Sequence, residues 1–216
     1  MILPETTLFP GGVHPLLIKR PSHCLLIKDS LETSRLLVLA NEDSPRKTPC
    51  AISGLGLIRA ALRQNNTYRI VIQGLARMLI KHPISLRPYP IYEIAPLEEE
   101  PFFDSENINI LANKLKRQVN EVVNKMSHLP SDINDNSIGV FPKIAQCIST
   151  PLEDFLKYVN QIEHPGVLAD LIASTMIIPG KDRQIILNEY TINRRLRIIN
   201  EIFCRTYGLP NSPDEF

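Results

Sequence analysis

Residues 91–103, IYEIAPLEEEPFF, separate two parts of the chain that differ in character. Residues 91–97 are typical of a β-strand that ends at Pro96, because proline has no backbone N–H to donate to a sheet. Three consecutive glutamates followed by Pro101 favour a solvated, extended connection. We therefore predict one subdomain in residues 1–100, a second in residues 101–210, and a frayed tail in residues 211–216.

Before this boundary, short apolar runs are interrupted by proline, glycine and asparagine. In residues 67–73, TYRIVIQ, alternate apolar side chains share one face of a strand, and a hairpin turn at residues 64–66 joins it to a strand at residues 56–62. We also expect strands at residues 16–18, 25–27, 36–40 and 76–81, a break at Gly74, a helical turn at residues 29–34 and a loop or sheet edge at residues 84–88. This pattern predicts a small barrel or a curled sheet.

After the boundary, apolar residues recur every three or four positions, which is the spacing of one helix face. The longest series consists of Ile108, Leu111, Ala112, Leu115, Val119, Val122, Val123 and Met126. Further helices are predicted from residue 152, from Pro165, over residues 182–190, and from residue 191 to a stop at Gly208. The sequence therefore predicts an α+β chain in which a β-rich part precedes a helical bundle.

The charge balance gives the chain no overall attraction to nucleic acids or anionic membranes. Lys and Arg total 24 against 23 Asp and Glu, for a net charge of +1. Neither a long apolar segment nor a secretory signal is evident, so we expect no membrane association. Cys24, Cys50, Cys147 and Cys204 form no CxxC pair, and we expect reduced thiols in a cytoplasmic protein.

A search for reactive motifs gives no candidate catalytic, cofactor-binding or metal-binding residues, and we predict that the chain is not an enzyme. The sequence has no phosphate-binding glycine loop and no nucleophile elbow. Its five histidines lack the spacing of a zinc site, and residues 132–136, DINDN, are not followed by the Gly and Glu of a calcium loop. Arg194, Arg195 and Arg197 are expected on the solvent side of a helix, with a phosphate or acidic-partner site as the alternative.

Three stretches together resemble a known family. They are residues 7–18 (TLFPGGVHPLLI), residues 68–80 (YRIVIQGLARMLI) with 88–100 (PYPIYEIAPLEEE), and residues 164–203 (HPGVLADLIASTMIIPGKDRQIILNEYTINRRLRIINEIF). In order and spacing they are similar to the N-terminal, substrate-binding domain of Lon protease. His164 departs from that pattern, because an acidic residue is common at its position.

This resemblance implies a PUA-like β-barrel subdomain followed by a helical bundle, the two forming one Lon N-terminal-type domain. It also implies a role in engaging polypeptides. The ATPase and peptidase modules of the full-length proteases have no counterpart in this sequence. We therefore expect the chain to be a stand-alone member of the family.

We predict a non-enzymatic module that binds unfolded or degron-bearing polypeptides, or a partner protein. Such a module needs exposed apolar area with a polar rim. The candidates are Phe9 and Pro10 in the first turn, and Phe102 and Phe103 just after the boundary. For both pairs the favoured interpretation is burial, the first pair in the core and the second against the helical part, and an exposed binding surface is the alternative.

RNA binding, as in other PUA-like barrels, is the alternative function. It would require Arg59, Arg63, Arg69 and Arg77 to gather on one sheet face. The balanced charge and the absence of tryptophan make a nucleic acid the less favoured partner. An independent hydrolase is the least favoured reading, because it would need a cleft with a strongly perturbed titrating pair.

Overall fold

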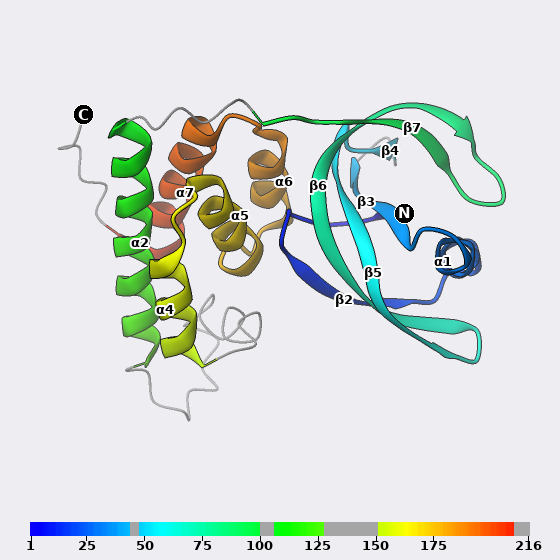
Figure 1. Ribbon diagram of the computed structural model, residues 1–216, viewed down its shortest axis with the longest axis horizontal. Coiled ribbons are helices and arrows are strands. Elements are labelled where there is room, and N and C mark those ends of the chain that lie inside the picture. Colours follow the sequence, from blue (N-terminus) through cyan, green and yellow to red (C-terminus); the bar gives the residue numbers. More distant parts are fainter. Residues whose placement is uncertain (44–47, 100–105, 128–150, 210–216) are drawn as a thin grey trace. The chain divides into compact units, whose positions relative to one another are not determined.

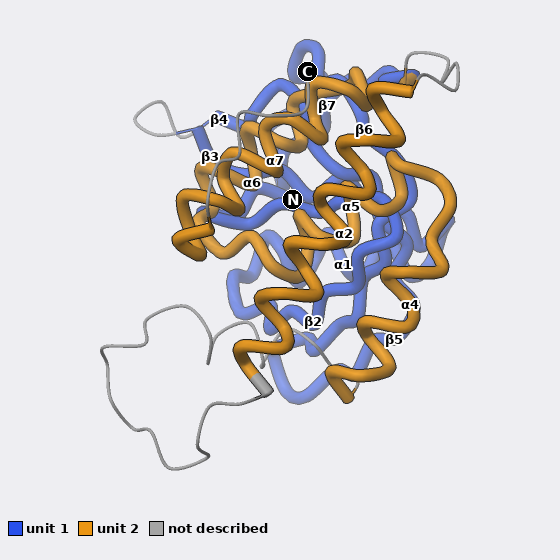
Figure 2. The backbone as a smooth tube through the Cα atoms, turned by 90° about the vertical axis from the view of Figure 1, so that its left-hand side faces the viewer, with its two compact units in different colours: residues 1–98 blue, residues 99–216 orange. Residues whose placement is uncertain are grey.

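The computed structural model describes residues 1–43, 48–99, 106–127 and 151–209 (Figure 1). The chain divides into two compact units, Met1–Glu98 and Glu99–Phe216, shown in different colours in Figure 2. The division lies two residues before the boundary expected from the glutamate run. Phe102 and Phe103 lie outside the described residues.

In its described residues, the first unit contains one seven-stranded sheet and one helix. Its elements are β1 (Ile2–Leu3), β2 (Val13–Ile18), α1 (Pro21–Glu32), β3 (Leu36–Asp43), β4 (Thr48–Pro49), β5 (Ile52–Gln64), β6 (Thr67–Ser85) and β7 (Ile91–Pro96). The main path through the sheet is β1-β3-β5-β6-β2, with β4 paired to β3 and β7 paired to β6. All pairs are antiparallel except β1 with β3.

The long strand β6 organises this sheet. One of its edges pairs with β5, and the other pairs first with β2 and then with β7 (Figure 1). The expected break at Gly74 is wrong, because β6 runs through it for 19 residues with only a shift of register opposite Gly56. The strand continues to Ser85, and there it pairs with β7 alone, so of the loop or edge expected from residue 84 onward the structure has a sheet edge at Ile84 and Ser85.

Residues 25–27, expected as a strand, belong instead to α1. Pro21 occupies the first helical turn, where a missing N–H costs nothing. A run of three apolar residues is too short for its periodicity to separate a strand from a buried helix. In the structure Ile27 is buried in the core of the first unit, whereas Leu25 is partly exposed.

The N-terminal segment crosses the sheet directly above two glycines. A Cβ atom on Gly54 would overlap the carbonyl oxygen of Leu8, and one on Gly74 would overlap that of Phe9. The backbone of the crossing segment is tied down by Gly11 N–H to Gly74 O at 2.9 Å and Gly74 N–H to Gly12 O at 2.8 Å. Close backbone packing therefore explains why these strand positions are glycine.

The second unit is helical in its described residues. It contains α2 (Glu106–Ser127), α4 (Leu152–Gln161), α5 (Pro165–Thr175), α6 (Gly180–Asn188) and α7 (Ile192–Tyr207). The apolar series predicted for α2 faces inward, with Leu115, Val119 and Val122 fully buried. α7 packs against α2, α5 and α6, and it ends at Gly208, whose φ of 63° is the left-handed conformation expected at a helix stop.

One of the three clustered arginines is buried, which corrects our expectation. Arg195 has no exposed surface and donates hydrogen bonds to Asp170, at 2.8 Å, and to Glu99. Burial alone would lower the pKa of Arg195, but the two carboxylates outweigh burial and raise it. Arg194 and Arg197 are exposed as predicted.

Candidate functional site

The outer face of strands β2, β6 and β5 carries apolar side chains in matched rows. Pro15 and Ala60 are the cross-strand neighbours of Val71, one on each side. In the next row, Leu17 and Leu62 flank Arg69 in the same way. Directly paired residues in a sheet point to the same face, so these side chains lie side by side on one surface.

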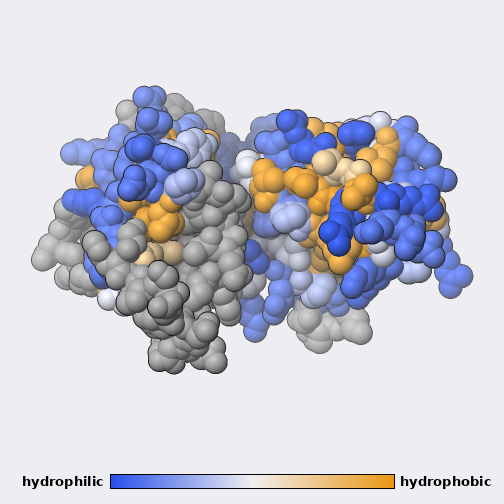
Figure 3. Space-filling view, turned by 90° about the horizontal axis from the view of Figure 1, so that it is seen from below, coloured by the Kyte–Doolittle hydropathy of each residue, from blue (hydrophilic) through white to orange (hydrophobic). Residues whose placement is uncertain are grey.

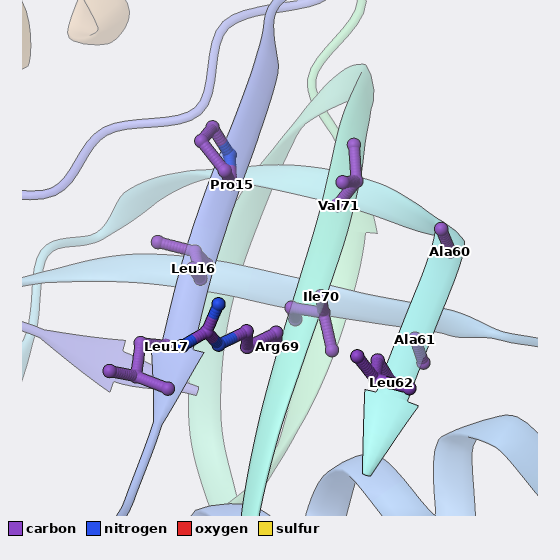
Figure 4. Close-up of a pocket in the computed structure, with 9 residues that line it drawn as sticks. All are labelled: Pro15, Leu16, Leu17, Ala60, Ala61, Leu62, Arg69, Ile70 and Val71. Carbon is purple, nitrogen blue, oxygen red and sulfur yellow. The ribbon is translucent and has the colours of Figure 1, made fainter. Parts of the chain in front are cut away.

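These rows surround a hollow of about 510 Å³. Nine residues from the three strands line it (Figure 4): Pro15, Leu16, Leu17, Ala60, Ala61, Leu62, Arg69, Ile70 and Val71. Leu17 is 51% exposed and Leu62 is 62% exposed, which is unusual for two leucines on neighbouring parts of one face. In Figure 3, hydrophobic residues gather on the surface of the sheet unit within a hydrophilic surround. We call the hollow lined by these nine residues the outer groove.

A β-bulge determines which side chains of β5 face the outer groove. Ile58 is buried, and unbroken alternation from it would place Ala60 and Leu62 on the buried face as well. Arg59 is an extra residue between the pairs Ile58–Ile72 and Ala60–Val71. The residues after it therefore change faces, and Leu62 points outward.

Arg69 is the one charged side chain among the residues that line the outer groove. In Figure 4 it points from β6 toward Leu17 on β2, its cross-strand neighbour. Within the described part of the chain, no hydrogen bond or ion pair engages its guanidinium. A cation among leucines favours a ligand that is apolar and carries one negative charge.

Of the residues predicted from the sequence, Phe9 and Pro10 are described by the structure, and neither lines the outer groove. Phe9 has no exposed surface, and its ring lies 6.0 Å from the guanidinium of Arg77, which is itself buried. Pro10 is half-buried beside the turn at Gly11. In this structure a partner cannot reach Phe9 without displacing the segment that crosses the sheet.

The four arginines that the RNA hypothesis would require on one sheet face do not share a face. Arg69 points outward, whereas Arg63 is paired with Tyr68 on the opposite face, 5.9 Å from the ring centroid. Arg77 is only 2% exposed, and Arg59 is the bulged residue. Strict alternation does not predict these faces, because a bulge reverses which residues point outward and the residue types do not indicate where a bulge occurs.

In the first unit, the described titratable groups with displaced pKa values are not among the residues that line the outer groove. Burial lowers the pKa of His23, and burial raises the pKa of Cys50. The pKa of Tyr89 is raised because its phenol donates a 2.6 Å hydrogen bond to Asp29. The lining of the outer groove holds neither a nucleophile nor a general base, so this surface can bind a ligand but offers no group for acid–base chemistry.

Metal-binding and membrane-spanning features were also sought in the described ranges. They contain no group of three or more His, Cys, Asp or Glu side chains that could hold a metal ion. None of their helices combines the length and the apolar composition that a membrane crossing requires.

Comparisons with known proteins agree on one family. The family model for the ATP-dependent protease La (LON) substrate-binding domain matches residues 1–205. The chain is 27% identical to a Lon protease of Anaeromyxobacter dehalogenans over 94% of its own length, and 27% identical to one of Dictyoglomus thermophilum over the same share. It spans 23% and 24% of the length of these two relatives.

Solved structures show the same fold. The N-terminal domain of a Mycobacterium avium complex Lon protease superposes with a TM-score of 0.72 at 16% identity, covering 94% of this chain and 95% of that one. A Lon N-terminal domain protein from Xanthomonas campestris gives a TM-score of 0.60 at 14% identity, covering 91% and 93%. The α+β prediction of a sheet-containing part followed by a helical part is confirmed.

Proposed function

Since this chain belongs to the ATP-dependent protease La (LON) substrate-binding domain family, we propose that it binds extended, apolar segments of other polypeptides in its outer groove. Unfolded and degron-bearing polypeptides both present such segments, and so can a folded partner with an extended arm. The observation that carries the proposal is the pair of exposed leucines, Leu17 and Leu62, on either side of a 510 Å³ hollow.

The energetics favour an apolar ligand. Covering exposed apolar surface stabilises a complex by about 25 cal/mol for each Å² removed from water. Exposed β-branched and leucine side chains on a sheet accept the alternating side chains of an extended segment, because both repeat every two residues. We also propose that the chain binds polypeptides without catalysing a reaction, because the groove lining lacks a nucleophile. The proposal includes a cytoplasmic location, where Cys24, Cys50 and Cys204 would remain free thiols.

The test is a matched pair of leucine variants. Leu62 and Leu86 are both 62% exposed, but only Leu62 lines the outer groove. Leu62→Ser should weaken binding of a fluorescently labelled, permanently unfolded polypeptide about tenfold, since a buried leucine contributes about 1.5–3 kcal/mol. Leu86→Ser should leave the Kd unchanged in the same anisotropy titration. Equal effects of the two substitutions would place binding elsewhere.

RNA binding is a second candidate because of a different hollow. A space of about 290 Å³ beside α1 is lined by Lys19, Lys28, Arg63 and Tyr68, and no acidic residue lines it. Three cations around a hollow are groups that hold the phosphates of a single strand. Tyr68 is only 7% exposed, so its ring offers no open face on which a base could stack. Also against RNA binding, Lys28 lies 3.9 Å from the carboxylate of Glu32.

A gel shift with a single-stranded oligonucleotide discriminates the two candidates. If RNA is the ligand, binding should fall steeply with salt and should be lost in Lys19→Ala/Arg63→Ala, while Leu62→Ser should not change it. If a polypeptide is the ligand, the order of the variants should be reversed.

A further inference from the structure

We propose that the outer groove takes a polypeptide by its C-terminal end, with the terminal carboxylate on Arg69 and the last apolar side chains along the strip beyond it. This inference rests on the proposed function and names the class of segment that the groove accepts. It follows from where the single charge of the groove lies relative to its apolar rows.

The exposed apolar side chains of β2, β6 and β5 form a strip along the strands, and the two ends of this strip differ. From Arg69 it passes over the row of Pro15, Val71 and Ala60, and then reaches Val13, which is 56% exposed and is the cross-strand neighbour of Gln73. In the other direction the apolar surface stops, because the residues that follow toward the β5–β6 turn are polar. These residues are Lys19, Gln64 and Thr67. Arg69 therefore marks one end of the strip.

The length of the strip suits a short terminal segment. Its rows contain Val13, Pro15 and Leu17 of β2, so they span four residue steps, or roughly 13 Å at about 3.3 Å per residue. An extended segment of about four residues covers that distance. A chain that lies along the strip and ends at Arg69 keeps its apolar side chains over Val71 and Val13, and it places no residue on the polar surface beyond.

The charge of Arg69 fits one carboxylate. A guanidinium presents two parallel N–H donors that match the two oxygens of a carboxylate. No Asp or Glu lines the groove, so a bound carboxylate meets no like charge there. A terminal carboxylate lies on the backbone rather than at the end of a side chain, so Arg69 can hold it while the neighbouring side chains stay in the hollow.

The experiment compares one decapeptide in two forms. Its last four residues are Val-Ala-Val-Leu, its N-terminus carries fluorescein, and its C-terminus is either a free acid or an amide. Anisotropy titrations against the full chain should give about fivefold tighter binding of the free acid at low salt. Arg69→Gln should abolish that difference by weakening the acid alone, and Arg69→Lys should retain part of it. Arg87→Gln removes the same charge from an exposed position outside the groove and should change nothing.

A third peptide tests where the negative charge must lie. It is amidated and carries the same four apolar residues followed by Asp-Gly-Ser. If it binds as tightly as the free acid in an Arg69-dependent way, Arg69 accepts an internal acid and the inference is overturned. Equal binding of acid and amide, or a preference that survives in Arg69→Gln, would also overturn it. If Leu62→Ser still weakens all the peptides in those cases, the proposed function stands; if no peptide depends on Leu62, the proposed function fails as well.

Discussion

Arg195 carries a full charge at a position with no exposed surface, and the carboxylates of Asp170 and Glu99 compensate it. Asp170 is only 6% exposed, whereas Glu99 is 33% exposed. A buried charge pair contributes little net stability compared with apolar residues of equal size, but removing one partner leaves the other charged and buried. This asymmetry makes Arg195 a sensitive position in the helical unit.

We predict that Arg195→Ala lowers the free energy of unfolding of the helical unit by about 3–5 kcal/mol. Arg195→Lys should lose less, because a lysine keeps the charge but cannot donate to both carboxylates with the fork of a guanidinium. Urea unfolding followed by far-UV circular dichroism measures both changes. Arg194→Ala, at an exposed neighbouring position, should stay within about 0.5 kcal/mol of the parent chain. A similarly small change for Arg195→Ala would show that the pair is not buried in solution.

Gly74 and Gly11 are required to be glycine for different physical reasons, close packing at the first and a positive φ at the second. A Cβ at Gly74 would overlap the carbonyl oxygen of Phe9, whereas a Cβ at Gly11 would meet no atom within 4 Å but would sit on a backbone with φ of +76°. We predict a loss of about 3 kcal/mol or more for Gly74→Ala, because the crossing segment must move. Gly11→Ala should lose about 1 kcal/mol from strain alone. Thermal unfolding of the two variants separates them, and equal losses would contradict the steric explanation.

At the scale of elements, the hairpin of β5 and β6 shows what the sequence can and cannot predict. The turn at residues 64–66 was predictable because asparagine tolerates positive φ, and Asn65 has φ of 54°. The bulge at Arg59 was not, because nothing in its residue type distinguishes it from a paired arginine. The exposure of Leu62 depends on that bulge, so alternation alone would have assigned Leu62 to the core.

Deleting Arg59 should therefore be tolerated, unlike most deletions inside a strand. The pairs Ile58–Ile72 and Ala60–Val71 would become consecutive, and every later residue would keep its partner and its face. We expect the Kd for an unfolded polypeptide to change less than twofold, and a cysteine placed by Leu62→Cys to react with maleimide as fast as in the parent background. Deleting Val71, a paired residue, should instead abolish folding of the sheet. Protection of the cysteine in the Arg59 deletion would contradict the register described here.

At the scale of the whole molecule, the division into a β-rich and a helical part was predictable from hydrophobic period, since it changes from two to about 3.6 near residue 100. The assignments that failed have two different causes, a distant partner for Arg195 and a short apolar run for residues 25–27. Glu99 lies 96 residues from Arg195, and residues 25–27 are helical in a segment where a three-residue apolar run gives no period to read. The outer groove was not predictable because β2 joins the β5–β6 hairpin from a distant part of the sequence and the bulge at Arg59 turns Leu62 outward.

We expect polypeptide binding to be a property of the first unit alone. Every residue that lines the outer groove lies within residues 1–98, and the described residues of that unit form a core of their own that includes Leu8, Ile58 and Ile72. We predict that residues 1–98, expressed alone, fold and bind an unfolded polypeptide with a Kd within about threefold of the full chain. Leu62→Ser should weaken that binding by the same factor in the fragment and in the full chain. Residues 99–216 alone should give a helical circular dichroism spectrum and should not bind the unfolded polypeptide. Binding of the polypeptide by that fragment would contradict the assignment of the site to the sheet.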